Sequence, residues 1–415
     1  MSLDRVFEDA VNSKQVPGIS ALALDKDGKI LYRGCFGTTN TNNPHASKIS
    51  PDTSFLIWSC TKLVTCVAAL QLLEQGKLSL DDPVEKHVPE IKEIKILDGF
   101  DSDGKPKYRD PKVTMTVRHL MTHTAGFTYD FFDEGTLKHR LALGQTPATI
   151  LATGGWHEFT TPLLHEPGER YTYGINIDWL GFCIEAISGM RLEEYIKENI
   201  LHPLGMNDSG SHLRPDQIDK FMVVHMKDQQ GNITPNLDIK SPDKPDKFGG
   251  GHYLTATIDD YGKFLLTILN NGTHPGSKTQ ILKEETVSKY IFTDHLHDIC
   301  SSDGVGIASS ALPPATRNGE FLPGIKKTWS CGLLINEEDT KYGRKRGSGM
   351  WAGLGNDYYW MDRESGKLGV VFSNVLPFLD ESISDCFDAL EKSVYGHKLT
   401  NETEGKNYKV EPWIA

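Results

Sequence analysis

The stretch FLIWSCTKLVTCVAALQLLEQG, residues 55–76, places a serine and a lysine at the start of a long apolar helix. Ser59 and Lys62 are three positions apart, so a helix puts both side chains on one face of its first turn. A neutral lysine there can accept the serine proton, and the helix N-terminus favours an oxyanion formed beside it. The stretch is therefore chemically suited to a nucleophilic serine.

Taken alone, the Ser-x-x-Lys pattern is weak, because the chain contains a second copy at residues 241–244. That copy, Ser241 to Lys244, lies in a loop rich in Pro and Asp without an apolar helix behind it, and we interpret it as chance. By itself, Ser59 is better interpreted as a helix N-cap, with Lys62 as a solvated partner. Cys60 is a rival nucleophile, but the one nearby base, Lys62, is better spaced for Ser59.

Composition limits the classes of function. The 415 residues include 44 Lys plus Arg and 56 Asp plus Glu, a net charge of -12 that disfavours nucleic acid as a partner. The charged N-terminus shows no apolar signal segment, and no run of 18 apolar residues occurs. Seven cysteines without CxxC spacing are expected to be reduced and mostly buried. We therefore expect a cytoplasmic protein without a membrane span.

The pattern of apolar residues predicts an α/β (α+β) fold. Both ends of the chain supply short strands, namely 18–25 and 29–36 near the start and 330–337, 356–362 and 368–374 near the end. We expect residues 1–58 and 325–415 to form one lobe, an antiparallel sheet flanked by helices. Residues 59–324 are expected to form a mostly helical lobe, because helical periodicity occurs over 59–75, 116–122, 176–188, 191–199 and 258–270. Polar stretches between these helices predict long surface loops at 98–111, 207–217, 238–250 and 298–327. The functional site is then expected in the cleft between the lobes.

Two further segments contain candidate site residues. In PGERYTYGINIDWLG, residues 167–181, Tyr173 comes just before a helix, where its phenol can project into a cleft or, alternatively, complete the core. In RGSGMWAGLGNDYYWMD, residues 346–362, four glycines precede an aromatic strand. Such a strand edge lets a substrate approach the backbone closely, although a plain glycine-rich turn or bulge has the same composition.

The order of SCTK, PGERYTY and a late glycine-rich strand resembles the serine β-lactamase and penicillin-binding-protein superfamily. VRHLMTHTAGF at 117–127, LHPLGMNDSG at 201–210 and FGGGHYLTATIDDYGKFL at 248–265 also fit, so the resemblance spans most of the chain. Within the superfamily, the spacing is most similar to the class C-like carboxylesterases, the family VIII esterases, and to the fungal acyltransferase that attaches the lovastatin side chain. The resemblance implies a β-lactamase/transpeptidase-like fold.

The resemblance also implies roles for individual residues. Ser59 would be the acylated nucleophile, Lys62 the group that deprotonates it, and Tyr173 the residue that relays protons to the leaving group or acceptor. The oxyanion hole would be the backbone N–H groups of Ser59 and Leu354. Leu354 follows the motif Trp351-Ala352-Gly353, whose Trp351 and Gly353 are expected to contact substrate.

Two departures from the superfamily pattern narrow the substrate. Tyr-x-Asn is replaced by Tyr173-Gly174-Ile175, and Lys-Thr-Gly by Trp351-Ala352-Gly353. Both changes remove groups suited to a β-lactam, so we expect an uncharged ester or thioester as the small-molecule substrate. We expect an ester hydrolase acting on a bulky apolar ester of the polyketide, statin type, without metal or cofactor. The alternative is an acyltransferase that moves a short acyl group to a secondary-metabolite alcohol, and a further one is a catalytically silent binding protein.

Two histidine-containing segments are further candidates for ligand sites. His119 and His123 are spaced i, i+4 as in a helical metal site, but HExxH is absent and two ligands are too few for a zinc site. HLHDIC, residues 295–300, is interpreted as a surface loop. The sequence contains no GxSxG elbow, Walker-type loop or GxGxxG run.

Overall fold

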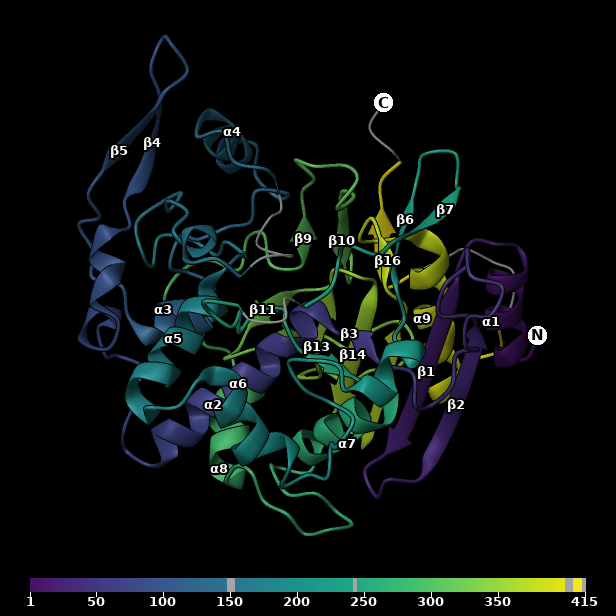
Figure 1. Ribbon diagram of the computed structural model, residues 1–415. Helices are drawn as coiled ribbons and strands as arrows, with labels where there is room; N and C mark the ends of the chain where they lie inside the picture. The colour runs from purple at the N-terminus through teal and green to yellow at the C-terminus, as the bar shows by residue number, and fades with distance from the viewer. Residues whose placement is uncertain (148–153, 242–244, 400–405, 413–415) are drawn as a thin grey trace.

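The computed structural model describes residues 1–147, 154–241, 245–399 and 406–412, and its main element is a seven-stranded sheet (Figure 1). The strand order is β11-β12-β13-β14-β15-β1-β2, and every neighbouring pair is antiparallel. The two ends of the chain meet where β1 pairs with β15, with Ser20 opposite Phe372. The strands are β1 (Gly18–Asp25), β2 (Ile30–Gly37), β11 (Lys327–Trp329), β12 (Leu334–Asn336), β13 (Gly349–Gly353), β14 (Asp357–Asp362) and β15 (Lys367–Phe372).

Helices cover both faces of this sheet. All six residues of β14 are buried, and successive side chains of a strand point to opposite faces. On one face Tyr359 packs against Tyr261 of α7 (Ile258–Leu269), with ring centroids 5.6 Å apart. On the other face Trp360 packs against Phe387 of α9 (Glu381–Val394), with centroids 5.2 Å apart. The remaining helix of this layer, α1 (Leu3–Asn12), lies beside α9 (Figure 1).

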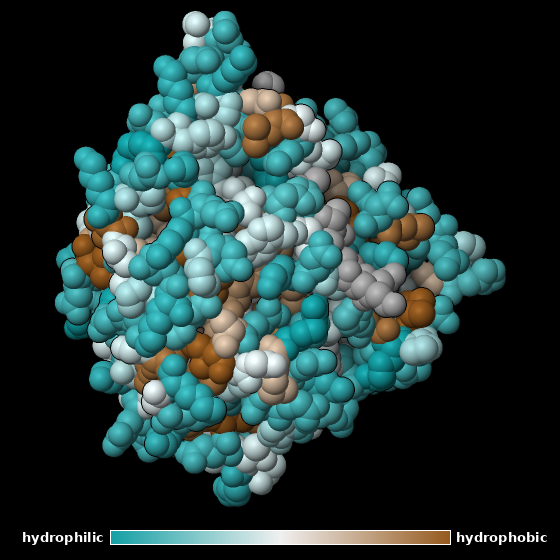
Figure 2. All heavy atoms as spheres, turned by 60° about the vertical axis from the view of Figure 1, so that its left-hand side comes forward, coloured by the Kyte–Doolittle hydropathy of each residue, from teal (hydrophilic) through white to brown (hydrophobic). Residues whose placement is uncertain are grey.

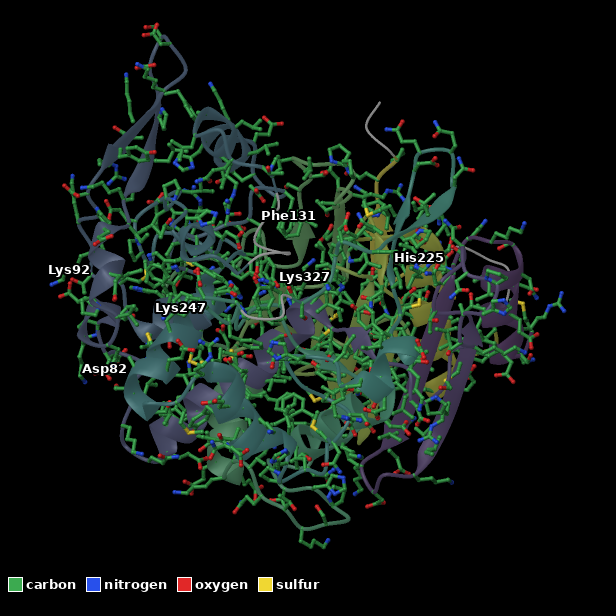
Figure 3. The ribbon with its side chains drawn as sticks, in the orientation of Figure 1. Asp82, Lys92, Phe131, His225, Lys247 and Lys327 are labelled. Carbon is green, nitrogen blue, oxygen red and sulfur yellow. The ribbon has the colours of Figure 1, made fainter. Side chains whose placement is uncertain are left out.

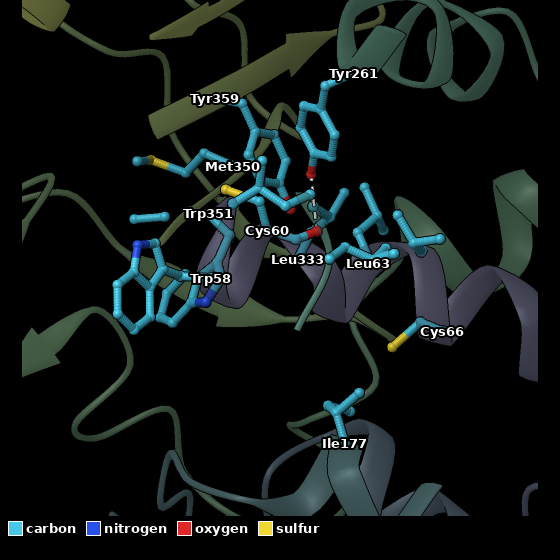
Figure 4. Packing of buried hydrophobic residues seen from close by; sticks show 14 of the residues in the cluster. Trp58, Cys60, Leu63, Cys66, Ile177, Tyr261, Leu333, Met350, Trp351 and Tyr359 are labelled. Atoms are coloured by element: carbon cyan, nitrogen blue, oxygen red, sulfur yellow. Dashed lines mark hydrogen bonds between the residues drawn. The ribbon is translucent and has the colours of Figure 1, made fainter. Parts of the chain in front are cut away.

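The helical part of the chain is organised around α2 (Thr61–Glu74). Residues 61–72 of this helix are all buried, as expected of a helix that is apolar on every side. Figure 4 shows Cys60, Leu63 and Cys66 among the side chains of the surrounding core. The other helices are α3 (Val117–Met121), α4 (Glu134–Ala142), α5 (Asn176–Ser188), α6 (Leu192–Ile196) and α8 (Glu284–Thr286). Of these, α5 and α6 contact α2 directly.

Some expected loops contain strands. Residues 98–111 overlap a hairpin of β4 (Ile96–Phe100) and β5 (Pro106–Arg109). Residues 298–327 contain β9 (Ile307–Ala308) and β10 (Gly319–Phe321), and β10 pairs with β17 (Tyr408–Val410). Alternating periodicity is hard to recognise in strands of two to five residues. The remaining strands are β3 (Phe55–Leu56), β6 (Val224–Lys227), β7 (Ile233–Asn236), β8 (Thr255–Ala256) and β16 (Val375–Leu376).

Most predicted helices and strands are present within one or two residues of their expected ends. The strand expected over 330–337 is shorter, because Ser330 and Leu333 form a turn and β12 begins at Leu334. The helix expected over 191–199 is shorter, because α6 passes into a π-helical turn over Lys197–Leu201. Of the second Ser-x-x-Lys copy, Ser241 donates to the carbonyl of Tyr253, whereas residues 242–244 lie outside the described part of the chain. The division into a sheet lobe and a helical lobe at residues 58 and 325 stays a prediction.

Figure 2 shows a largely hydrophilic face on which apolar patches are separated from one another. Within the described residues, no helix is both long and apolar enough to cross a membrane.

Candidate active site

Ser59 and Lys62 lie together at the start of α2. Ser59 belongs to the 3₁₀ turn Trp58–Cys60, and α2 continues directly from it. The Nζ atom of Lys62 is 3.0 Å from Ser59 Oγ, 2.9 Å from Tyr129 Oη and 2.9 Å from the carbonyl oxygen of Gly251. Lys62 is 1% exposed, so these three contacts occupy the amine in place of water. The predicted pair is thus brought into hydrogen-bond contact, and the solvated-lysine interpretation is wrong.

Tyr173 lies in the same site but is oriented differently from what we expected. The ring centroid of Tyr173 is 4.9 Å from Lys62 Nζ, so the lysine faces the ring and not the hydroxyl. The hydroxyl oxygen accepts a hydrogen bond of 3.0 Å from the indole N–H of Trp351. Tyr173, which the resemblance associates with proton relay, therefore contacts Lys62 through its ring and Trp351 through its hydroxyl oxygen.

The phenol that contacts Lys62 belongs to Tyr129, which sequence reasoning missed. Burial raises the pKa of Tyr129 well above its usual range, and the nearby Asp178 carboxylate and Tyr173 act in the same direction. Tyr129 is therefore a neutral phenol at ordinary pH. The available signal was its place two residues after the TAGF segment that ends at residue 127.

The turn that carries Ser59 is packed against the end of β13. Trp58 has a φ of +45°, a backbone conformation that is costly for a bulky residue. Its indole N–H donates to Asn374 Oδ1 at 2.8 Å, which helps to hold it there. A Cβ atom on Gly353 would lie 2.7 Å from the carbonyl oxygen of Ile57 and 3.1 Å from Trp58 Cβ. Only glycine fits at 353, and Leu354, the next residue, is thereby placed close to the Ser59 turn.

Ser59 and Leu354 both line a cavity of about 180 Å³. Trp351 and Gly353 line it as well, as expected for substrate-contacting residues. We call it the aromatic cavity, because nine of its 21 lining residues are aromatic: Trp58, Tyr129, Phe131, Phe132, Tyr171, Tyr173, Phe321, Trp351 and Phe378. Such walls favour an apolar ligand fixed by few polar groups.

Residues of the loop at 298–327 complete this cavity. Ile307 and Ala308 of β9 line it beside Phe131, and the backbone carbonyl of Phe131 accepts from Ala311 N–H at 2.9 Å. Phe131 is labelled in Figure 3, close to β9 of Figure 1. The expected surface loop is therefore part of the site's wall.

The rival nucleophile is unsuited to the task. Cys60 is fully buried, and burial raises the pKa of its thiol well above the usual range. The carbonyl of Cys60 accepts a hydrogen bond of 3.0 Å from the hydroxyl of Tyr261, drawn as a dashed line in Figure 4. A thiol held protonated in the core is a poor nucleophile.

The other clusters have structural partners. His119 Nδ1 accepts from the backbone N–H of Thr116 and so completes the cap of α3, whereas His123 Nδ1 lies 2.9 Å from Asn176 Nδ2. In HLHDIC, His295 Nε2 lies 2.8 Å from the carbonyl oxygen of Lys289. The described ranges contain no group of three or more His, Cys, Asp or Glu side chains placed to hold a metal ion.

Comparisons with known proteins cover nearly the whole chain. A family model described as Beta-lactamase matches residues 3–385. ML-236A carboxylate methylbutanoyltransferase of Penicillium citrinum is 28% identical over 409 residues, which are 95% of this chain and 93% of that protein. Lovastatin esterase of Penicillium rubens is 27% identical over 400 residues, 95% of this chain and 98% of that protein. The solved structure of a mutant simvastatin synthase from Aspergillus terreus superposes with a TM-score of 0.82 at 28% identity, covering 95% of this chain and 96% of that one.

Proposed function

The chain belongs to the β-lactamase family, and from this membership we propose that it transfers a short acyl group from an ester or thioester to an apolar alcohol through an acyl ester on Ser59. The expected fold, an antiparallel sheet flanked by helices, and the expected resemblance are both confirmed. The enzyme is therefore of the hydrolase and acyltransferase type of this family.

One observation carries the proposal: Lys62 lies between Ser59 Oγ and a neutral phenol inside an aromatic cavity. In its neutral form Lys62 accepts the Ser59 proton while Oγ attacks the acyl carbon. The carbonyl oxygen of the substrate becomes an oxyanion, for which the N–H groups of Ser59 and Leu354 are the donors. Collapse of this intermediate expels the leaving alcohol or thiol, which takes up a proton, and leaves the acyl group on Ser59.

The second half of the reaction reverses these steps. The hydroxyl of the acceptor attacks the acyl-Ser59 carbonyl and loses its proton, and Ser59 leaves with a proton returned to Oγ. Tyr173 is our candidate for moving protons to and from the leaving group and the acceptor, because it lines the cavity next to Lys62. Water can replace the acceptor, so hydrolysis and transfer differ only in what attacks.

The relatives favour transfer over the hydrolysis that the sequence alone led us to expect. A methylbutanoyltransferase and a simvastatin synthase support a short acyl group and a polyketide alcohol of the statin type as substrates. The esterase similarity keeps hydrolysis of a bulky apolar ester as the second candidate. A silent binding protein is disfavoured because Ser59 and Lys62 are in contact.

A partition experiment tests the proposal. Enzyme is incubated with a short-chain acyl thioester and a panel of polycyclic secondary alcohols, and free acid and new ester are quantified by mass spectrometry. Transfer predicts that new ester exceeds free acid with at least one alcohol, and that the isolated product is hydrolysed slowly. Free acid in excess with every alcohol would favour the hydrolase, and no turnover with any donor would favour a binding protein. Ser59→Ala is the control for background acyl exchange.

A further inference from the structure

The backbone of Gly251 is hydrogen-bonded both to Lys62 and to a buried carboxylate. The carbonyl oxygen of Gly251 accepts from Lys62 Nζ at 2.9 Å, and its N–H donates to Asp178 Oδ1 at 3.0 Å. Asp178 lies in the first turn of α5 and is fully buried. The backbone of Gly251 is therefore hydrogen-bonded to the carboxylate through its N–H and to the amine that contacts Ser59 through its C=O, groups that belong to the two peptide units on either side of its Cα.

The Cα of Gly251 leaves no room for a side chain. A Cβ atom on Gly251 would lie 2.6 Å from Asp178 Oδ2 and 3.1 Å from Lys62 Nζ. Oδ2 has no hydrogen-bond partner among the described residues, and it lies close to the Cα of Gly251. The carboxylate and the amine thus both pack against the backbone of Gly251.

His252 and Tyr129 show that Asp178 belongs to the site. His252 Nδ1 is 3.3 Å from Asp178 Oδ1, and His252 lines the aromatic cavity. The charge of Asp178 also reaches Tyr129, whose pKa is raised first by burial and then by that carboxylate. Asp178 therefore acts next to both the cavity wall and the phenol that contacts Lys62.

We propose that Asp178 is a positioning residue that, through the backbone of Gly251, directs Lys62 toward Ser59. A neutral amine has two N–H bonds and one lone pair. With its two N–H bonds directed to the carbonyl of Gly251 and the oxygen of Tyr129, its lone pair faces the Ser59 hydroxyl. Without the hydrogen bond to Asp178 the backbone of Gly251 can shift, its carbonyl then moves as well, and the amine loses the contact that fixes this direction. The inference rests on the proposed acyl-serine chemistry and names the residue that orients its base.

The test compares Asp178→Ala with Asp178→Asn. The alanine variant leaves the Gly251 N–H without a buried acceptor, whereas the asparagine amide oxygen can accept the same hydrogen bond. For Asp178→Ala we expect kcat for an activated ester, and the rate of Ser59 labelling by a fluorophosphonate, to fall about 10- to 100-fold, as expected for a misplaced catalytic group. KM should change by no more than about twofold, and Asp178→Asn should recover most of the rate.

The outcomes separate the two levels of the proposal. Unlabelled wild-type enzyme would contradict the acyl-serine function itself. Labelled wild type together with equally fast Asp178→Ala would overturn the positioning role alone. The positioning role would also be overturned if Asp178→Asn is as slow as Asp178→Ala while both variants unfold at the wild-type temperature. The hydrogen bond from the Gly251 N–H would then not determine the rate.

A second variant keeps the test valid if Asp178→Ala does not fold. Gly251→Ala adds one methyl group between the carboxylate and the amine, so the peptide must shift, and we expect a similar loss of kcat with little change in KM. Gly210→Ala is the matched control, since the nearest atom to its new Cβ would be 3.9 Å away. Wild-type kcat in Gly251→Ala would contradict the requirement for a fixed peptide.

Discussion

Replacing Tyr129 with Phe removes one of the three polar contacts of Lys62. The lost hydrogen bond is 2.9 Å long, and at 1% exposure of Lys62 water has no ready access to replace it. Leaving a buried polar group without its hydrogen-bond partner costs about 1–3 kcal/mol. At about 1.36 kcal/mol per factor of ten in rate, Tyr129→Phe should slow acylation of Ser59 about 5- to 160-fold. The ring stays in place, because it stacks on Phe131 with centroids 4.8 Å apart.

The assay is the pre-steady-state burst of nitrophenolate from a nitrophenyl ester, with Tyr173→Phe as the matched control. Nitrophenolate leaves as an anion, so its release needs no proton from a relay. Tyr173→Phe should therefore keep a fast burst and slow the later transfer to an alcohol, whereas Tyr129→Phe slows the burst itself. A fast burst in Tyr129→Phe with a lost burst in Tyr173→Phe would refute the reasoning and return the phenol's role at Lys62 to Tyr173.

Three further predictions concern the same site. Ser59→Ala should abolish labelling and turnover while the unfolding temperature stays within about 4 °C of wild type, and a labelled peptide in this variant would disprove the nucleophile. Trp351→Phe removes the indole N–H that donates to Tyr173, and should reduce transfer to alcohols more than the burst, which stopped-flow and product analysis together measure. Burial raises the pKa of Asp357 well above its usual range, so the native state holds a proton that the unfolded chain releases above about pH 4. Stability contributed by this carboxyl falls as pH rises, and Asp357→Asn should therefore gain unfolding temperature over wild type at pH 8 but not at pH 4.

The fold was largely predictable because its signals are local. The short apolar runs of β1 and β15, each bounded by turn residues, and a helix that is apolar on all sides, α2, indicate their structure within a few residues. The strands β9 and β10 were missed because two or three residues carry no period, and they form only by pairing with each other and with the distant β17.

The site was only partly predictable because its decisive contacts are non-local. Ser59 and Lys62 are three residues apart, and spacing alone brings them together. Tyr129 and Gly251 reach Lys62 from 67 and 189 positions away, and neither has a pattern of its own that points to the amine. Tyr173 was placed correctly in the cavity, but the direction of its hydroxyl depends on Trp351, 178 positions further on.

The union of the two chain ends in one sheet has a chemical consequence. Pairing of β1 with β15 places β14 and the end of β13 against the turn of Ser59, and Asn374, just after β15, receives the indole N–H of Trp58. The backbone angle φ of Trp58 is unfavourable, so contacts with the surrounding residues must stabilise it. They do so at Gly353 and Gly355, where a Cβ atom would lie 3.1 Å from Trp58 Cβ and 2.5 Å from its Nε1. The two glycines that pack against the turn of Ser59 thus flank Leu354. The packing that forms the sheet therefore also brings together the two residues of the proposed oxyanion hole.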